Sequence, residues 1–430
     1  MITKHLSPRS SNPESTPYLK QPTKNSSESD PNCSLSITKA LDIVTEPNDS
    51  KAIVPNESNA IEGQKNKPLN YHHLQFNRPL HLLRGLAIIA IVGAHAWSFM
   101  IFWTGSLDSV GLEVLFSVTE MLFHGSTLYF AIISGLLFSL ILAKRSWKQF
   151  YLSKLINVLL PYIAVSLCYF SFYGGWQAEG DIKQFLLSVW TGKASIHLWY
   201  IPVLMALYAL TPLLWSIARR PELSLVSIVI ILLPLIISRS PFPDFIKLQT
   251  FIYFIGAYTL GMFAGNYYQQ VLDWIGNHIK MLLTLLVILS ISITSSYFYD
   301  FTDIGWFSLR QSLIYAQKVI ITATVLYGLH WLVDQEGIAK HPLLVSSKLE
   351  STKRAVTALG DMAFSIYFLH VFFMGWVIYA VQDWFLIDRS APEILVYGLL
   401  SLISSIAASV MFTKMMQLVL NKHSRKLIGA

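Results

Sequence analysis

An arginine and a histidine interrupt the first long apolar stretch of the chain, LLRGLAIIAIVGAHAW at residues 82–97. Arg84 and His95 are eleven residues apart. On an α-helix this is about three turns plus 20° and a rise of about 16 Å, so both side chains project from one face. A guanidinium can bind a phosphate through two parallel hydrogen bonds, and a neutral imidazole can take a proton from a hydroxyl near physiological pH. The pair could therefore bind an anionic substrate at one level and activate an alcohol at another.

A purely structural role is the alternative for each residue. The long Arg84 side chain could reach lipid headgroups, and His95 could hydrogen-bond a neighbouring helix. Ionisable groups at membrane depth are costly and usually face a partner or a water-filled cavity. We therefore expect this face to line a polar cavity, with Arg84 near the cytoplasmic edge and His95 near the middle of the bilayer.

Membrane-spanning helices are the elements that would position these residues. The chain of 430 residues is 53% hydrophobic and only 13% charged, with a mean hydropathy of +0.48. Apolar runs near the spanning length of about 20 residues recur with short polar gaps, which predicts an all-α polytopic membrane protein. No gap is long enough for a soluble catalytic domain. We expect ten spans, at approximately 80–102, 120–143, 152–173, 196–217, 222–239, 249–267, 280–298, 310–333, 361–384 and 392–418.

Residues 1–70 differ in composition from the expected ten-helix domain at 71–430. They are rich in Ser, Asn, Pro, Lys and Glu and show no sustained apolar period, so we expect a disordered polar tail. Lysine and arginine gather after the second, fourth and eighth expected spans and at the end of the chain, which places both termini in the cytoplasm. The net charge of +7 follows from these loops, and we expect no nucleic-acid partner. We expect an integral protein of the bacterial inner membrane.

Two histidines and two neighbouring aromatic residues are further cavity candidates. Tyr367 and His370 fall about one turn apart, and His370 would lie about 15 Å into the membrane, near the level of His95. A proton path and a hydrogen-bonded helix contact are equally compatible with them. His197 and Trp199 begin the fourth span, where His197 could bind an acceptor and Trp199 could be an interfacial anchor.

Three more polar residues interrupt the apolar runs. Ser134 could donate toward a reacting group, but the Ser134–Gly135 pair is more typical of close helix packing. Lys318, deep inside the eighth span, is expected to line a cavity. Glu120 is expected to be an exposed residue at a helix end.

Five segments in order resemble the acyltransferase-3 family of integral membrane acyltransferases. The first is the Arg84–His95 pair itself, with ten residues between the two. The others are FAIISGLLFS at 130–139, FYLSKLINVLLPY at 150–162, HLWYIPVLMALY at 197–208 and LGDMAFSIYFLH at 359–370. The resemblance covers about residues 78–418 and leaves out the tail. It departs at the start of the third helix, where the family commonly carries Arg-x-x-Arg and this chain has Lys154 and Asn157.

The resemblance implies an O-acyltransferase that uses a cytoplasmic acyl-CoA, with acetyl-CoA the first candidate. The acceptor would be a hydroxyl of an envelope carbohydrate or a lipid-linked glycan. His95 would act as general base and Arg84 would assist it from the donor side; an acyl-histidine relay is the alternative. The phosphate-bearing end of the donor would be held by basic residues: Arg84, Lys144, Arg145, Lys148 and Lys154. The two cysteines, Cys33 and Cys168, read as structural, and no spacing predicts a bound metal or cofactor.

Two other classes compete with an enzyme. A transporter or flippase for a lipid-linked sugar or small anion would also place cationic side chains and histidine in a central cavity. Such proteins usually carry internal repeats with matching broken helices, and none is visible in the sequence. A structural or sensor protein leaves the Arg84–His95 pair unexplained. The sequence also lacks GxxxxGK[ST], GxSxG and HExxH, which argues against an ATP-driven pump, a serine hydrolase and a metalloprotease.

Overall fold

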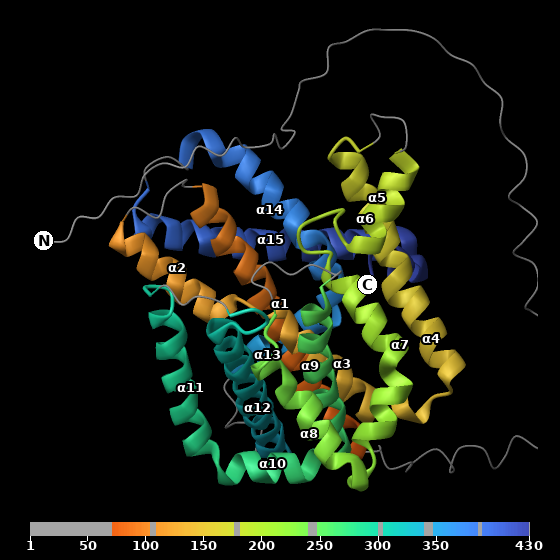
Figure 1. Ribbon diagram of the computed structural model, residues 1–430. Coiled ribbons are helices and arrows are strands. Elements are labelled where there is room, and N and C mark those ends of the chain that lie inside the picture. Colours follow the sequence, from red (N-terminus) through yellow and green to blue (C-terminus); the bar gives the residue numbers. More distant parts are fainter. Residues whose placement is uncertain are drawn as a thin grey trace, which may run out of the picture. The chain divides into compact units, whose positions relative to one another are not determined.

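The computed structural model describes residues 71–103, 109–175, 181–239, 247–299, 304–338, 347–385 and 389–429. These residues are helices and their connections, with one isolated β-bridge between Ile304 and Phe307 (Figure 1). The chain divides into two units, Met1–Lys67 and Pro68–Ala430. The expected tail at 1–70 lies outside the described residues.

The helices follow one another with short connections. In chain order they are α1 (Tyr71–Trp103), α2 (Val110–Phe123), α3 (Thr127–Leu140), η1 (Leu142–Lys144), α4 (Trp147–Lys154), η2 (Leu155–Leu159), α5 (Leu160–Phe172), α6 (Asp181–Thr191), α7 (Tyr200–Ala218), η3 (Pro221–Leu223), α8 (Ser224–Leu232), η4 (Leu233–Leu235), α9 (Leu248–Asn266), α10 (Tyr268–Asn277), α11 (Ile279–Ser295), α12 (Leu309–Ile338), α13 (Ser347–Asp361), α14 (Ala363–Phe385), α15 (Ala391–Leu420), η6 (Asn421–His423) and α16 (Ser424–Ile428).

The all-helical membrane class predicted from the sequence is confirmed. Among the described residues, seven helices are long and apolar enough to cross a membrane, or up to nine if each of two bent helix pairs is one span. The seven are Arg78–Phe102, Val110–Leu140, Trp147–Phe172, Tyr200–Ala218, Leu248–Asn266, Leu309–Val333 and Ala391–Leu420.

The predicted count of ten spans is not reproduced. The segment expected at 222–239 is a short apolar helix, Pro221–Leu235, in which α8 gives way to the 3-10 turn η4 around Pro234. The spans expected at 280–298 and 361–384 are second arms of bent pairs, with bends of 77° between α10 and α11 and 83° between α13 and α14. Hydropathy records composition and not the direction of a helix axis, so the sequence could not reveal these bends. The sidedness of the termini rested on ten spans and stays a prediction.

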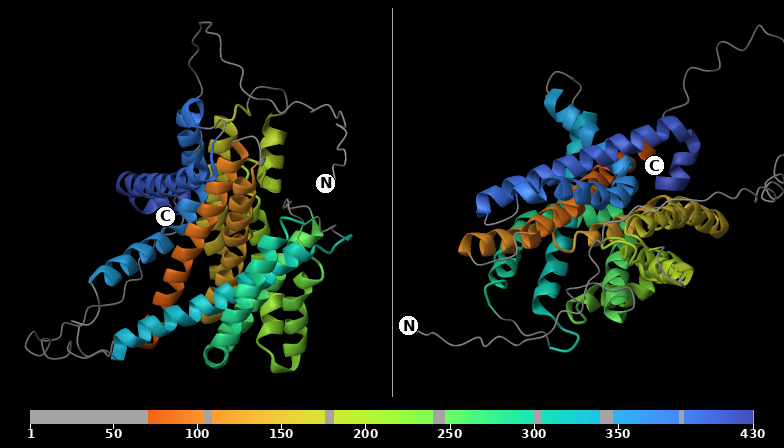
Figure 2. Two further views of the ribbon diagram at one scale, coloured as in Figure 1. Left: turned by 90° about the vertical axis from the view of Figure 1, so that its left-hand side faces the viewer. Right: turned by 90° about the horizontal axis from the view of Figure 1, so that it is seen from above.

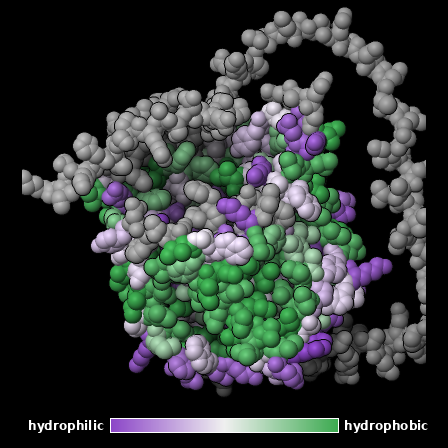
Figure 3. Space-filling model, viewed as in Figure 1, coloured by the Kyte–Doolittle hydropathy of each residue, from purple (hydrophilic) through white to green (hydrophobic). Residues whose placement is uncertain are grey.

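Apolar side chains gather over the lower centre of the face seen in Figure 3, with hydrophilic residues along its lower edge. Two helices contribute exposed aliphatic residues of the kind that meet lipid. On α8, Leu225 and Val229 are exposed, and on α11 Val287 and Ile291 are exposed. An apolar surface of this extent on a chain with so few charges is typical of a membrane-embedded domain.

Helix α1 is the central element for the candidate site. It packs against α2, α3, α12, α13, α14 and α15, and the two views of Figure 2 place α1 and α3 between α14 and α15 on one side and α8 and α9 on the other. Glycines let α13 approach closely: a Cβ on Gly360 would lie 2.1 Å from the His81 carbonyl oxygen, and one on Gly85 would lie 2.1 Å from that of Val356. This contact brings Arg84 next to the end of α13.

Helices α3 and α9 approach each other in the same way. A Cβ on Gly135 would lie 2.2 Å from the Tyr258 carbonyl oxygen, and one on Gly261 would lie 2.1 Å from that of Ile132. No side chain fits at either position without separating the helices. The packing interpretation of the Ser134–Gly135 pair therefore agrees with the structure.

Candidate functional site

Three histidines from distant parts of the sequence form the centre of the site, which we call the histidine cluster. His95 lies on α1, His370 lies on α14, and His197 lies in the turn before α7. The ring centroids of His95 and His370 are 5.1 Å apart, those of His197 and His370 are 4.9 Å apart, and those of His95 and His197 are 6.3 Å apart. The sequence placed His95 and His370 at one depth, and the structure brings them into contact.

Hydrogen bonds assign the tautomers of two of these rings. His370 Nδ1 lies 3.0 Å from the Ile366 carbonyl oxygen and 2.8 Å from that of Tyr367. Because carbonyl oxygens only accept, Nδ1 carries the hydrogen and His370 Nε2 is an acceptor. That Nε2 lies 3.4 Å from His95 Nδ1, which is itself 3.0 Å from the Ile91 carbonyl oxygen. His95 Nδ1 is therefore the donor, and its Nε2 keeps a free lone pair.

Accessibility separates His95 from the other two histidines. His370 is 0% exposed and His197 is 1% exposed, whereas His95 is partly exposed. His197 Nδ1 lies within hydrogen-bond distance of the Ser195 hydroxyl, at 3.2 Å. Burial, followed by the nearby His370 and His95, lowers the pKa of His197 well below its usual value, so that ring is neutral. Of the three histidines, only His95 is partly exposed.

Two tyrosines fix the elements that carry the cluster. The Tyr367 hydroxyl donates to the His197 carbonyl oxygen and joins α14 to the turn before α7. The Tyr169 hydroxyl donates to the Phe368 carbonyl oxygen at 3.1 Å and joins α5 to α14. The turn itself needs Gly192, which has φ of +75° and would clash with Trp199 if it carried a Cβ. Tyr367, a cavity candidate from the sequence, therefore acts here as a structural contact.

Arg84 and Lys154 converge on one tyrosine, Tyr208 of α7. Lys154 Nζ lies 4.3 Å from the centre of the Tyr208 ring, and the Arg84 guanidinium interacts electrostatically with Tyr208 and with the Asp361 carboxylate. Asp361 also accepts from His81 Nδ1 at 2.5 Å. Arg84 and His95 thus both face the α13–α14 pair, as their helical spacing predicted.

The other basic candidates lie on the surface at the turn between α3 and α4. Lys144, Arg145 and Lys148 are all exposed, and Arg145 lines a cavity between α4 and α7. Asn157 lies in the π-helical segment η2, and its Nδ2 donates to the Ser153 carbonyl oxygen at 2.8 Å. Its amide is therefore used within its own helix and does not replace the arginine of the related proteins.

Ser134 and Trp199 do not join the histidine cluster. Ser134 makes no hydrogen bond to His95 in the part of the chain that the structure describes. The Trp199 ring packs 5.8 Å from Phe254, and the Arg239 guanidinium lies 5.7 Å above it. Trp199 therefore packs against Arg239 and Phe254.

A buried charged network beside the cluster was missed by the sequence analysis. His124 Nδ1 lies 2.8 Å from a Glu120 carboxylate oxygen, and its Nε2 accepts from Arg239 Nη2 at 3.1 Å. The Ser98 hydroxyl, one turn beyond His95, donates to Glu120 at 3.3 Å. Burial lowers the pKa of Arg239, and Tyr253 and Glu120 oppose this shift. The Glu120 side chain is only 15% exposed, so the expectation of an exposed helix end is wrong. The four residues of this network, Ser98, Glu120, His124 and Arg239, are spread over 141 positions, so no spacing in the sequence indicated that they meet.

Lys318 closes the end of a helix and does not line a cavity. Its side chain is 0% exposed, and Nζ donates to the carbonyl oxygens of Met121 and Leu122 at 2.9 and 2.8 Å. These carbonyls belong to the last turn of α2, where helical partners are missing and the dipole favours a cation. The cavity-lining expectation is wrong because the break between α2 and α3 supplies the partner that the sequence could not show.

Replacing Lys318 by methionine is expected to destabilise the protein. Two carbonyl groups would lose their donor inside the protein, at a cost of about 1–3 kcal/mol each when unsatisfied, offset by removal of a buried charge. We expect a clear fall in the midpoint of thermal unfolding in detergent. Lys280→Met on the exposed surface of α11 is the matched control; equal midpoints for the two variants would contradict the capping role.

No group of three or more His, Cys, Asp or Glu side chains among the described residues is arranged to hold a metal ion. In the histidine cluster, two Nδ1 atoms are directed at carbonyl oxygens and one Nε2 is directed at a neighbouring ring. The lone pairs therefore do not converge on one point.

Comparison with known proteins gives one finding. A family model described as an acyltransferase domain matches residues 77–414, which contain the histidine cluster, Arg84 and Lys154. No curated protein and no solved structure matches the chain.

Proposed function

Because the chain belongs to the acyltransferase 3 family, we propose that it moves an acyl group, acetyl in the first instance, from cytoplasmic acyl-CoA to a hydroxyl of an envelope carbohydrate or lipid-linked glycan. The protein would do so within the bacterial inner membrane, and His95 lies in one of its candidate membrane spans, Arg78–Phe102. One observation carries the proposal: His95 is the accessible member of the histidine cluster, and its Nε2 is free to accept a proton.

The proposed reaction needs one base and one activated thioester. His95 Nε2 takes the proton of the acceptor hydroxyl as its oxygen attacks the thioester carbonyl. The carbon–sulfur bond then breaks, and the leaving thiolate takes the proton back from His95, so no net proton is gained or lost. The hydrogen on His95 Nδ1 stays with the Ile91 carbonyl oxygen and His370 Nε2 throughout, which keeps the reactive nitrogen in place.

Donor and acceptor would approach His95 from different levels. Arg84 and Lys154 support a phosphate site on the donor side, because both cations interact with Tyr208 and, among the described residues, Asp361 is the one carboxylate that interacts with Arg84. On the other side, Glu120 and Arg239 supply groups that accept from and donate to sugar hydroxyls. Glu120 lies beside Ser98, one helical turn beyond His95, and His124 joins Glu120 to Arg239.

A transfer assay with the purified protein tests the proposal against transport. We expect free CoA to form, and ester to appear on extracted envelope glycans, when the protein in liposomes receives acetyl-CoA. Movement of a lipid-linked sugar across the liposome membrane without any acyl-CoA, and without ester formation, would support the transporter alternative and overturn the enzyme.

Arg84→Gln is expected to weaken binding of the acyl-CoA donor and to change the rate of the chemical step much less. A hydrogen bond to a charged group contributes about 1.5–3 kcal/mol, so the KM for acyl-CoA should rise about 10- to 100-fold while kcat changes less. Arg389→Gln is the control, because Arg389 pairs with Glu393 at the start of α15 and has no part in the proposed site. An unchanged KM in Arg84→Gln would contradict the phosphate role.

A further inference from the structure

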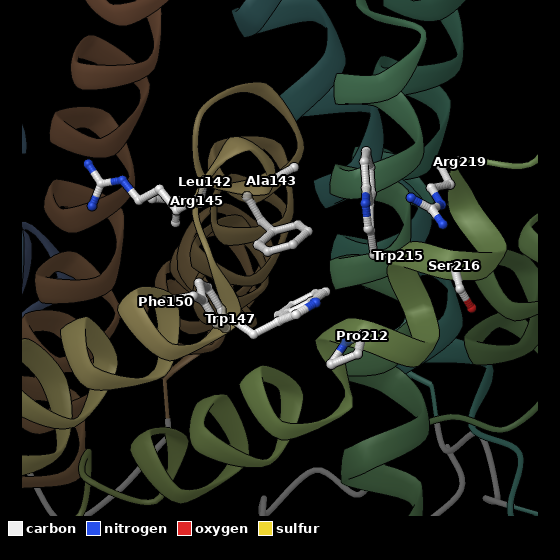
Figure 4. Close-up of a pocket in the computed structure, with 10 residues that line it drawn as sticks. Leu142, Ala143, Arg145, Trp147, Phe150, Pro212, Trp215, Ser216 and Arg219 are labelled. Atoms are coloured by element: carbon white, nitrogen blue, oxygen red, sulfur yellow. The ribbon is translucent and has the colours of Figure 1, made fainter.

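A cavity of about 340 Å³ lies between the start of α4 and the end of α7, and we call it the α4–α7 pocket. Its lining joins aromatic and basic residues with no acidic one: Phe138, Leu142, Ala143, Arg145, Trp147, Phe150, Pro212, Trp215, Ser216 and Arg219. Figure 4 shows the indoles of Trp147 and Trp215 extending from the two helices toward the pocket, with Arg219 beside Trp215 and the Arg145 guanidinium pointing away from both indoles.

The aromatic rings form an ordered wall. The rings of Phe138 and Trp147 are stacked at 5.9 Å with an angle of 17°, and Trp215 meets Phe138 edge-on at 5.5 Å. Trp147 is nevertheless 43% exposed, so one face of its indole is available to a ligand. Flat rings of this kind bind nucleobases by stacking, and arginine binds phosphate.

We infer that the α4–α7 pocket binds the adenine nucleotide at the end of the acyl-CoA donor, with adenine stacked on the exposed face of Trp147, Trp215 against its edge and a phosphate on Arg219. This inference rests on the proposed function and adds a subsite to it. The volume is near the lower end of the range for small-molecule pockets, about 300–1,000 Å³, which suits a nucleoside and leaves the thioester arm outside.

Side-chain contacts link the pocket to the residues proposed to lead to the histidine cluster. Phe150 lines the pocket and meets the Tyr208 ring edge-on at 5.9 Å. Tyr208 in turn contacts Lys154 and interacts with Arg84. When the adenine of the donor is bound in the pocket, Lys154 and Arg84 would bind the remaining phosphates of acyl-CoA. The flexible arm that carries the thioester would then extend along α1 to His95.

An anionic lipid is the other source of phosphate at such a surface. A headgroup phosphate can pair with Arg219, but it offers no flat ring for the two indoles. The aromatic lining therefore favours a nucleotide, and the contribution of Trp147 distinguishes the two ligands.

Binding measurements on four variants test the inference. Affinities for CoA, adenosine 3′,5′-bisphosphate and 4′-phosphopantetheine are measured by calorimetry on the full chain in phosphatidylcholine nanodiscs. Trp147→Leu should weaken the binding of CoA and of the bisphosphate about tenfold to a hundredfold. Arg219→Gln should weaken the binding of the same two ligands about tenfold or more. Phosphopantetheine should bind all variants equally. Trp331→Leu, an exposed indole on α12, and Arg220→Gln, outside the pocket, are the controls.

The outcomes separate the subsite from the reaction. Variants that bind CoA as the wild type does would overturn the inference and leave the proposed function standing, whereas a wild type that binds no CoA would overturn both. A Trp147→Leu effect that appears only after phosphatidylglycerol is added to the nanodiscs would assign the pocket to lipid and also overturn the inference. Because Trp147 is partly exposed, the variant should fold, which size-exclusion chromatography checks.

Discussion

His95→Gln is expected to abolish acyl transfer while the protein still accumulates in the membrane. A positioned general base contributes about 10²- to 10⁴-fold to a rate, and no other imidazole nitrogen in the histidine cluster is accessible. Glutamine keeps a polar group near the ring position, so the packing of α1 against α14 should change little. The measurement is the ester content of envelope glycans in cells, followed by kcat with purified protein.

His278→Gln is a closely matched control for this substitution. His278 Nδ1 lies 2.8 Å from the carbonyl oxygen four residues earlier, that of Trp274, which is the same local contact that His95 makes with Ile91. His278 is exposed at the end of α10. We expect the control to retain wild-type activity, and CoA to bind His95→Gln normally. Wild-type ester content in the His95 variant would remove this residue from the mechanism.

Spacing along one helix was the most informative part of the sequence. Arg84 and His95 are correctly predicted to share a face because the helical period is fixed by backbone geometry. The depth of His370 was predicted by the same arithmetic from the position of Gly360, but Gly360 lies on α13 and His370 lies on α14, beyond the 83° bend. Arg84 and His95 could be related in advance because both lie on one continuous helix, whereas the contact of His370 with His95 depends on that bend.

Breaks and contacts between helices were beyond the sequence. The chain leaves the helical path at Gly125, between α2 and α3, where φ is +74°, and this break creates the carbonyl site for Lys318. The partners of Glu120 and Lys318 come from residues far away in the chain, so single side chains in apolar runs could not be interpreted correctly. His197 was expected at an outer helix end, and the turn that brings it to His370 depends on Gly192.

His370→Leu is expected to lower kcat without weakening the binding of the acyl-CoA donor. As His95 takes a proton, its Nδ1 hydrogen becomes a charged donor, and the bond to His370 Nε2 strengthens in the transition state. Losing a bond to a charged group costs about 1.5–3 kcal/mol, which corresponds to about a 10- to 100-fold lower kcat. The KM for acyl-CoA should not change, because His370 is 0% exposed and is not available to the donor.

A second variant separates positioning of His95 from simple packing. In His370→Gln the side-chain oxygen can occupy the place of Nε2 and accept from His95 Nδ1, so this variant should recover much of the kcat that His370→Leu loses. The double variant His95→Gln/His370→Leu should be no slower than His95→Gln alone, because a residue that acts only through His95 has no effect once the base is gone. Additive losses in the double variant, or equal losses in His370→Gln and His370→Leu, would show instead that His370 supports only the packing of α14 against α1.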